Sequence, residues 1–268
     1  MKKFDRKLIL EDGSEYYGYG FGAEIESITE IVFNTAPVGY QEIISDPSYT
    51  YQTVVMAYPL IGNYGIAEDD FETEVPTIGG IVVRDYNFRS KYTLAESLRK
   101  YGIPGISGID TRKLVRSIRN LGSRKVLITD VETSLEEGLD KLANYDIPEN
   151  AVAVVSRKKK QEYRVLDAKY QVAAIDCGMK QNIIRCLNRL GCNVMVFPWN
   201  TSLEAIERLE PDGIFFSNGP GNPTDVPSVI ELVKQLRGKY PIFGICLGHQ
   251  IIALAYGAKT YKLKFGHR

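Results

Sequence analysis

The chain has 268 residues, and its 33 basic and 33 acidic residues give a formal net charge of zero. With 44% hydrophobic and 25% charged residues, the composition excludes a disordered or fibrous protein, and the neutral balance argues against a nucleic-acid-binding surface. At about 150 residues per domain, this length predicts two domains rather than one.

Cysteines, histidines and apolar segments narrow the class of protein further. The four cysteines include no Cys-x-x-Cys pair and there are only two histidines, so we expect neither a disulfide framework nor a metal site. The apolar run at 8–10 is too short for a secretory signal. The uncharged stretch at 240–258 contains Pro241 and several glycines, which favours a buried strand and helix over a membrane span. These features predict a soluble, cytoplasmic protein.

The N-terminal part of the chain, residues 1–156, mixes strands and helices. Segments 6–10 and 15–21 flank Glu11-Asp12-Gly13-Ser14, a turn sequence that predicts a β-hairpin. Further strands are predicted at 29–35, 52–58 and 79–86, and helices at 94–101, 111–121 and 134–143. Asp110 precedes the second of these helices as an expected N-cap.

A charged run then separates two apolar regions. It reads Arg157-Lys158-Lys159-Lys160-Gln161-Glu162. Charge runs of this kind are usually solvated, so we predict a linker at 157–171.

Residues 172–268 alternate short apolar strands with helices. Strands are predicted at 172–176, 193–197, 213–217 and 241–245, and helices at 181–190, 205–209, 227–237 and 247–256. Thr201 and Glu204 have capping-box spacing before the second helix, and Gly191 and Gly257 follow helices as expected C-terminal caps. The alternation predicts an α/β fold with a doubly wound parallel sheet, covered on both faces.

The strongest chemical signal is Gly244-Ile245-Cys246-Leu247-Gly248, where a buried strand meets a helix. This is the pattern of a nucleophile elbow with cysteine in the central position. The flanking glycines leave room for a strained turn, and the helix N-terminus would stabilise a thiolate. We therefore predict that Cys246 is a nucleophile rather than a buried structural cysteine, and that the N–H of Leu247 faces a developing oxyanion.

A second signal follows the strand at 213–217. Turn-forming residues dominate the sequence Ser217-Asn218-Gly219-Pro220-Gly221-Asn222-Pro223. It matches neither of the phosphate-binding loop patterns GxxxxGK(S/T) and GxGxxG. Because parallel strands place their carboxyl ends at one edge, this loop and Cys246 can face one crevice. Together they predict acyl transfer through a thioester, with oxyanion donors from both loops.

The residues alone do not complete a catalytic triad. A thiol nucleophile usually needs a base. His249 lies three residues beyond Cys246 on a helix that leads away from it, and His267 is the second-last residue. We expect neither histidine to be the base.

These motifs resemble those of known families. FGICLGHQ (243–250) with SNGPGNP (217–223) is similar to the class I, triad-type glutamine amidotransferases, in which a cysteine attacks the side-chain amide of glutamine and ammonia leaves. Further segments resemble the carbamoyl-phosphate synthase small-chain family in the same order: VFNTAPVGYQEIISDPSY (32–49), YPLIGNYGI (58–66), GIDTRKLVRSIRNLG (108–122), IDCGMKQNIIRCL (175–187) and GAKTYKLKFGH (257–267). The resemblance spans essentially the whole chain.

The resemblance implies a domain order and a set of site residues. Residues 1–156 would form the small-chain N-terminal domain, and residues 172–268 a partial amidotransferase domain. Cys246 matches the nucleophile, and the positions that match glutamine-binding residues are Gly219, Gly221, Leu247, Gln250 and Ser48. Gly221 and Leu247 would supply oxyanion N–H groups. By its own sequence context Ser48 would be a turn residue, and only the resemblance assigns it a substrate contact from the N-terminal domain.

The family's catalytic histidine and glutamate lie in a later segment. The sequence stops at Phe265-Gly266-His267-Arg268, so we expect a chain truncated at its C-terminus. Asn222 also stands where aspartate is common in the family's loop.

The resemblance implies the glutaminase subunit of a carbamoyl-phosphate synthase. Ammonia would pass through an internal tunnel to a large subunit, which uses bicarbonate and ATP to make carbamoyl phosphate for arginine and pyrimidine synthesis. We expect no cofactor in this chain, because ATP and its metal ion would bind the large subunit of the heterodimer. Two alternatives remain open: an amidotransferase for another acceptor, such as anthranilate or a purine nucleotide, and a non-catalytic subunit with a vestigial elbow. The large N-terminal domain argues against the first.

Overall fold

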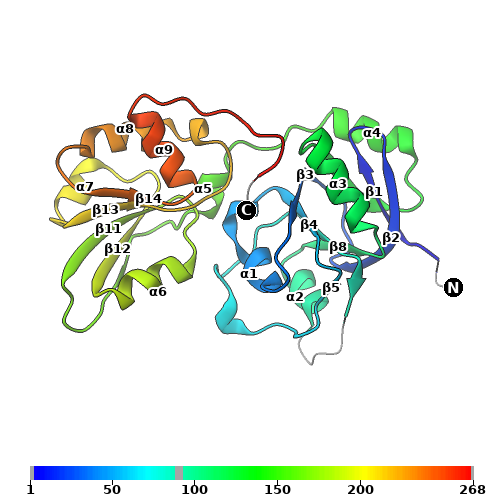
Figure 1. Cartoon of the computed structure of the whole chain (residues 1–268), viewed down its shortest axis with the longest axis horizontal. Coiled ribbons are helices and arrows are strands. Elements are labelled where there is room, and N and C mark those ends of the chain that lie inside the picture. Colours follow the sequence, from blue (N-terminus) through cyan, green and yellow to red (C-terminus); the bar gives the residue numbers. More distant parts are fainter. Residues whose placement is uncertain (1–2, 88–92, 267–268) are drawn as a thin grey trace. The chain divides into compact units, whose positions relative to one another are not determined.

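The structure is a computed structural model that describes residues 3–87 and 93–266. It divides the chain into two compact units, one of residues 1–148 with 262–268 and one of residues 149–261 (Figure 1). Within the described ranges, no helix is both long and apolar enough to span a bilayer.

The first unit is built on a closed barrel with the strand order β1-β2-β8-β6-β4-β3-β9 (Figure 1). The strands are β1 (Arg6–Leu10), β2 (Glu15–Gly22), β3 (Ser27–Asn34), β4 (Gln52–Met56), β6 (Gly80–Val82), β8 (Pro104–Ser107) and β9 (Lys125–Asp130). The predicted hairpin is confirmed, since β1 and β2 pair antiparallel. Leu8 lies opposite Tyr16 of β2 and Ile128 of β9, so β9 closes the barrel on the first strand.

Helices and short elements surround this barrel. They are α1 (Tyr40–Ser45), η1 (Pro47–Tyr49), β5 (Leu60–Ile61), η2 (Glu68–Asp70), β7 (Asp85–Tyr86), α2 (Leu94–Lys100), α3 (Thr111–Leu121) and α4 (Leu135–Ala143). The three helices predicted in this part are therefore confirmed. Asp110 caps α3 as predicted, because its carboxylate accepts a hydrogen bond from the N–H of Lys113 at 2.9 Å. Leu114 and Ile118 of α3 are fully buried in a core shared with the strands, as the helical spacing requires.

The second unit contains a five-stranded sheet with the order β10-β12-β11-β13-β14. The strands are β10 (Gln161–Tyr163), β11 (Tyr170–Asp176), β12 (Cys192–Pro198), β13 (Gly213–Phe216) and β14 (Ile242–Gly244), and the helices are α5 (Ala151–Val155), α6 (Gln181–Arg189), α7 (Leu203–Glu207), η3 (Pro223–Asp225), α8 (Pro227–Leu236) and α9 (Leu247–Ala255). The pairs β12–β11, β11–β13 and β13–β14 are parallel, which confirms the predicted parallel sheet.

Both faces of this sheet are covered. Along β11, Ala173 and Ile175 pack in one core with residues of α8 and α9, whereas Ala174 packs in a second core with Ile184 of α6. This alternation is the period-two pattern of a strand buried on both sides. Figure 1 shows α8 and α9 on one face and α6 on the other, so the doubly wound fold is confirmed.

Two local features differ from the sequence-based expectations. Ser202, and not Thr201, caps α7, since its hydroxyl accepts from the N–H of Ala205 at 3.3 Å. Part of the segment expected as a solvated linker forms β10, which pairs antiparallel with β12. The side chain of Arg157 in the same segment is only 19% exposed. Composition shows the charge of this run, but it does not show that a buried partner compensates part of that charge.

Candidate active site

Cys246 lies in the sharp turn between β14 and α9. Its φ of 51° and ψ of −110° fall outside the regions that L-residues prefer, and such conformations cost roughly 1–3 kcal/mol. Two backbone hydrogen bonds hold the turn: the N–H of Ile245 donates to the carbonyl of Phe216 at 3.1 Å, and the N–H of Gly248 donates to the carbonyl of Ser217 at 3.0 Å. The strained strand–turn–helix predicted from the sequence is therefore present, and its cysteine is exposed.

The two flanking glycines are required by close packing of backbone on backbone. A Cβ on Gly244 would lie 2.6 Å from the carbonyl carbon of Gly248. A Cβ on Gly248 would lie 2.2 Å from the carbonyl oxygen of Phe216. Neither obstacle is a side chain that could rotate away, so the turn accepts no larger residue at these positions without moving.

The loop that follows β13 packs directly against the start of α9. A Cβ on Gly219 would lie 2.0 Å from the carbonyl oxygen of Cys177 and 2.9 Å from Cδ2 of Leu247. Gly221 has a φ of 82°, which favours glycine. Asn222 ends the loop by capping η3, where its side-chain oxygen accepts from the N–H of Thr224 at 3.2 Å. Because β13 and β14 are neighbours, this loop and the elbow leave the same edge of the sheet.

Two backbone amides at this edge are available to an anion. In the described part of the chain, the N–H groups of Leu247 and Gly221 donate no hydrogen bond to the protein. Leu247 is the first residue of α9, so its N–H has no partner within the helix and adds to the positive potential there. Gln250, one turn along α9, has an exposed side chain. Both amides therefore belong to the loop after β13 and the elbow, which leave this edge of the sheet.

Ser48 belongs to the first unit. It lies in η1, and its backbone N–H donates to the Asp46 carboxylate at 2.9 Å. Ser48 is partly exposed. This geometry is that of a turn residue, which is what its local sequence predicts.

Within residues 3–87 and 93–266, no side chain is hydrogen-bonded to the Cys246 thiol. His249 is exposed on α9, and in the same ranges no hydrogen bond or ion pair joins it to Cys246. His267 lies outside the described residues. In the same described ranges, no group of three or more His, Cys, Asp or Glu side chains could hold a metal ion.

The surroundings of the other cysteines distinguish them from Cys246. Burial raises the pKa of the Cys177 thiol, and the nearby Asp176 raises it further. Burial also raises the pKa of Cys192. Cys186 is exposed but lies within α6, away from any helix N-terminus. Cys246 is therefore the cysteine that combines exposure with a strained turn at the start of a helix.

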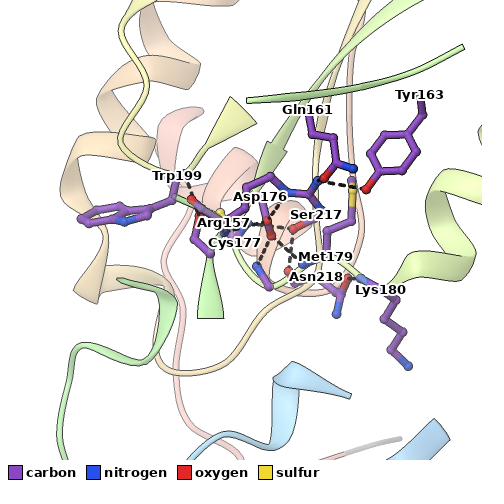
Figure 2. Close-up of polar contacts among 12 residues, drawn as sticks. Arg157, Gln161, Tyr163, Asp176, Cys177, Met179, Lys180, Trp199, Ser217 and Asn218 are labelled. Carbon is purple, nitrogen blue, oxygen red and sulfur yellow. Dashed lines mark hydrogen bonds and ion pairs between the residues drawn. The ribbon is translucent and has the colours of Figure 1, made fainter. Parts of the chain in front are cut away.

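A polar network that the sequence analysis missed lies at the end of β11 (Figure 2). Asp176, 3% exposed, accepts hydrogen bonds from the N–H groups of Gly178 at 2.9 Å and Met179 at 2.8 Å. The second carboxylate oxygen of Asp176 accepts two hydrogen bonds from Arg157, one from its backbone N–H at 3.0 Å and one from its side-chain Nε–H at 2.8 Å. The only sequence signal for this network is an aspartate at the carboxyl end of a buried strand.

The network continues into the loop after β13. The N–H of Cys177 donates to the Ser217 hydroxyl at 2.9 Å, and the N–H of Lys180 donates to the side-chain oxygen of Asn218 at 3.2 Å. Ser217 and Asn218 are both buried. Figure 2 shows these contacts joining the two strand ends.

Comparison with known proteins agrees with this fold and site. Residues 173–268 match the family model of class-I glutamine amidotransferases. The parallel sheet and the cysteine elbow thus define a glutamine amidotransferase domain.

The first unit shows which amidotransferase this is. Residues 8–128 match the model of the carbamoyl-phosphate synthase small chain, CPSase domain. The carbamoyl phosphate synthase small chain of Staphylococcus saprophyticus is 51% identical over 98% of this chain and 73% of its own length. The carbamoyl phosphate synthase small chain of Fusobacterium nucleatum is 50% identical over 99% of this chain and 75% of its own length. The pyrimidine-specific small chain of Bacillus subtilis is 47% identical over 98% of this chain and 73% of its own length. The chain belongs to the carbamoyl-phosphate synthase small-chain family of glutamine-hydrolysing enzymes.

Proposed function

We propose that this chain is the glutaminase subunit of a carbamoyl-phosphate synthase and hydrolyses glutamine through a thioester on Cys246. One observation carries the proposal: an exposed cysteine occupies a strained elbow beside backbone amides that donate to no protein acceptor. Cys246 is the N-cap residue of α9, at the positive end of the helix dipole. The neighbouring amides would stabilise the negative charge that develops when the cysteine sulfur attacks glutamine.

The reaction has two stages. The Cys246 sulfur forms a bond to the side-chain carbonyl carbon of glutamine, and the carbonyl oxygen becomes an oxyanion. When the oxyanion collapses, the carbon–nitrogen bond breaks and the nitrogen leaves as ammonia after taking up a proton. Water then attacks the thioester carbon, the carbon–sulfur bond breaks, and glutamate and the free thiol result.

Substrate contacts are proposed for the residues that form this edge. The N–H groups of Leu247 and Gly221 would hold the oxyanion, and Gly219 would let the loop approach the substrate closely. The exposed side chain of Gln250 can reach the polar end of glutamine. We also propose a glutamine contact for Ser48 of the first unit, which rests on family resemblance alone.

Ammonia would be used by a large subunit in a heterodimer. We propose that it reaches that subunit through an internal tunnel and that the large subunit, with ATP, its metal ion and bicarbonate, makes carbamoyl phosphate. This chain would itself need no cofactor. The product would serve pyrimidine synthesis, as the name of the Bacillus subtilis relative indicates for that protein, and arginine synthesis. A cytoplasmic location suits the four free cysteines.

The test is Cys246→Ala in the full-length protein assembled with its large subunit. Glutamine-dependent carbamoyl phosphate synthesis should fall to background, whereas synthesis from added ammonium should persist. Cys186→Ala, which removes an exposed thiol from α6, is the matched control and should keep both activities. Glutamine-dependent synthesis in Cys246→Ala, or no labelling of wild-type Cys246 by a γ-glutamyl chloroketone, would refute the proposal.

A further inference from the structure

We propose that Arg157 and Asp176 form a positioning pair that holds the loop of Gly219 and Gly221 in the geometry needed to bind glutamine. The inference rests on the proposed function, because it assumes that this loop contacts the substrate. Neither residue would touch glutamine. Each would act through the backbone between β11 and the loop after β13.

The pair is anchored more firmly than an exposed ion pair would be. Asp176 is buried and uses both carboxylate oxygens, one for the N–H groups of Gly178 and Met179 and the other for Arg157. Arg157 in turn donates to the Tyr163 hydroxyl of β10 at 3.2 Å. Charge-assisted bonds of this kind are short and directional, so the residues just after β11 have little freedom.

Cys177 and Gly178, which these hydrogen bonds fix, lie directly against the loop of Gly219 and Gly221. A Cβ on Gly178 would lie 3.1 Å from Cα of Gly219 and 3.0 Å from Cδ of Pro220. The carbonyl oxygen of Cys177 would lie 2.0 Å from a Cβ on Gly219, and the N–H of Cys177 donates to Ser217 at the end of β13. Because backbone packs on backbone here, a shift of residues 176–179 must move the Gly219 loop.

The electrostatics keep the Arg157 guanidinium charged. Burial works against the charge on Arg157, but the hydrogen bond and the charge of Asp176 outweigh it and raise the pKa of the guanidinium. An uncharged substitute for Arg157 would leave the Asp176 carboxylate buried without its cation. The loop around Asp176 would then reorganise to reach water.

The experiment compares two labelling reactions of Cys246 in the full-length protein bound to its large subunit. A γ-glutamyl chloroketone must occupy the glutamine site before it reacts, whereas iodoacetamide needs only an accessible thiol. Mass spectrometry of the Cys246 peptide gives both rates, and the exposed Cys186 is an internal reference for general reactivity. The variants are Arg157→Gln, Arg157→Lys and Asp176→Asn. Arg164→Gln removes an exposed ion pair with Glu162 from the same segment and is the matched control.

For Arg157→Gln and Asp176→Asn we expect chloroketone labelling and kcat/KM for glutamine to fall roughly 10- to 100-fold, the cost of an ångström-scale misplacement. Iodoacetamide labelling and ammonia-dependent synthesis should stay close to wild type. Arg157→Lys, which keeps the charge but not the planar fork, should recover part of the loss, and it decides the question if Arg157→Gln does not fold. Unchanged chloroketone labelling, or equal losses with both reagents, would overturn the inference. Wild-type protein that the chloroketone does not label would instead refute the proposed function.

Discussion

Replacing Gly248 by alanine should disable the elbow while leaving the protein folded. The added Cβ would lie 2.2 Å from the carbonyl oxygen of Phe216 and 2.8 Å from that of Ser217. Ordinary carbon–oxygen contacts begin at about 3.3 Å, so the start of α9 must move away from β13 by about 1 Å. The Phe216 carbonyl cannot easily give way, because it accepts the hydrogen bond from Ile245 that holds the turn.

Two magnitudes follow from that displacement. Overpacking one methyl group costs about 1–3 kcal/mol of stability, which a domain with an otherwise intact core tolerates. A displacement of about 1 Å at the nucleophile can cost about 100-fold in rate. We therefore expect Gly248→Ala to lose about two orders of magnitude in glutamine-dependent kcat/KM with a modest fall in melting temperature.

The assay is carbamoyl phosphate synthesis by the assembled enzyme, with glutamine or ammonium as nitrogen source. Gly213→Ala is the control in the same sheet, since its Cβ would meet only the carbonyl of Pro241 at an ordinary 3.5 Å. Ammonium-dependent synthesis should be normal in both variants. If Gly248→Ala retains wild-type glutamine turnover, the close backbone packing described here does not set the position of Cys246.

Two further predictions concern the first unit. Thr29 and Thr53 share a buried hydroxyl–hydroxyl hydrogen bond of 2.7 Å, so Thr53→Val should cost about 1–3 kcal/mol by leaving the Thr29 hydroxyl unpaired, and the double variant with Thr29→Val should recover most of that loss in urea unfolding. A hydrogen bond from Thr129 lowers the pKa of Glu26. The stability it confers is therefore complete above the ordinary glutamate value of about 4.3 and is lost as the pH falls through the lowered value. Glu26→Gln should then destabilise the protein more at pH 7 than at an acidic pH below the ordinary glutamate value, and an equal effect at both would contradict this reasoning.

The amidotransferase fold was accessible from the sequence because its signals are local. Apolar runs of four or five residues, which predict strands, alternate with segments whose apolar residues have helical spacing. Gly191 ends α6 at a φ of 80°, as its position predicts. The elbow is likewise contained in five consecutive residues, and each glycine has a steric reason that the structure makes explicit.

Long-range features were not accessible in this way. The barrel closes because β1 pairs with β9, and nothing in either strand specifies a partner more than a hundred residues away. The pairing of Arg157 with Asp176 is hidden for a similar reason. A charge run indicates solvent unless a buried counter-charge is known, and that partner lies at the end of another strand. Thr201 has capping-box spacing with Glu204, but the adjacent Ser202 is the residue that caps α7, because sequence spacing alone does not fix where a helix begins.

The position of β9 in the barrel also affects how newly made protein matures. Strand β9 pairs with both β1 and β3, so those two strands keep open edges until residue 130 has been synthesised. At about 5–20 residues per second, the ribosome takes on the order of 10 s to travel from β1 to β9. During that interval the buried residues of β1 have no native neighbour on one side, and exposed strand edges recruit other chains. The first unit therefore completes its native strand pairing only after residue 130 has been synthesised, and until then β1 and β3 each keep an edge that is open to pairing with other chains.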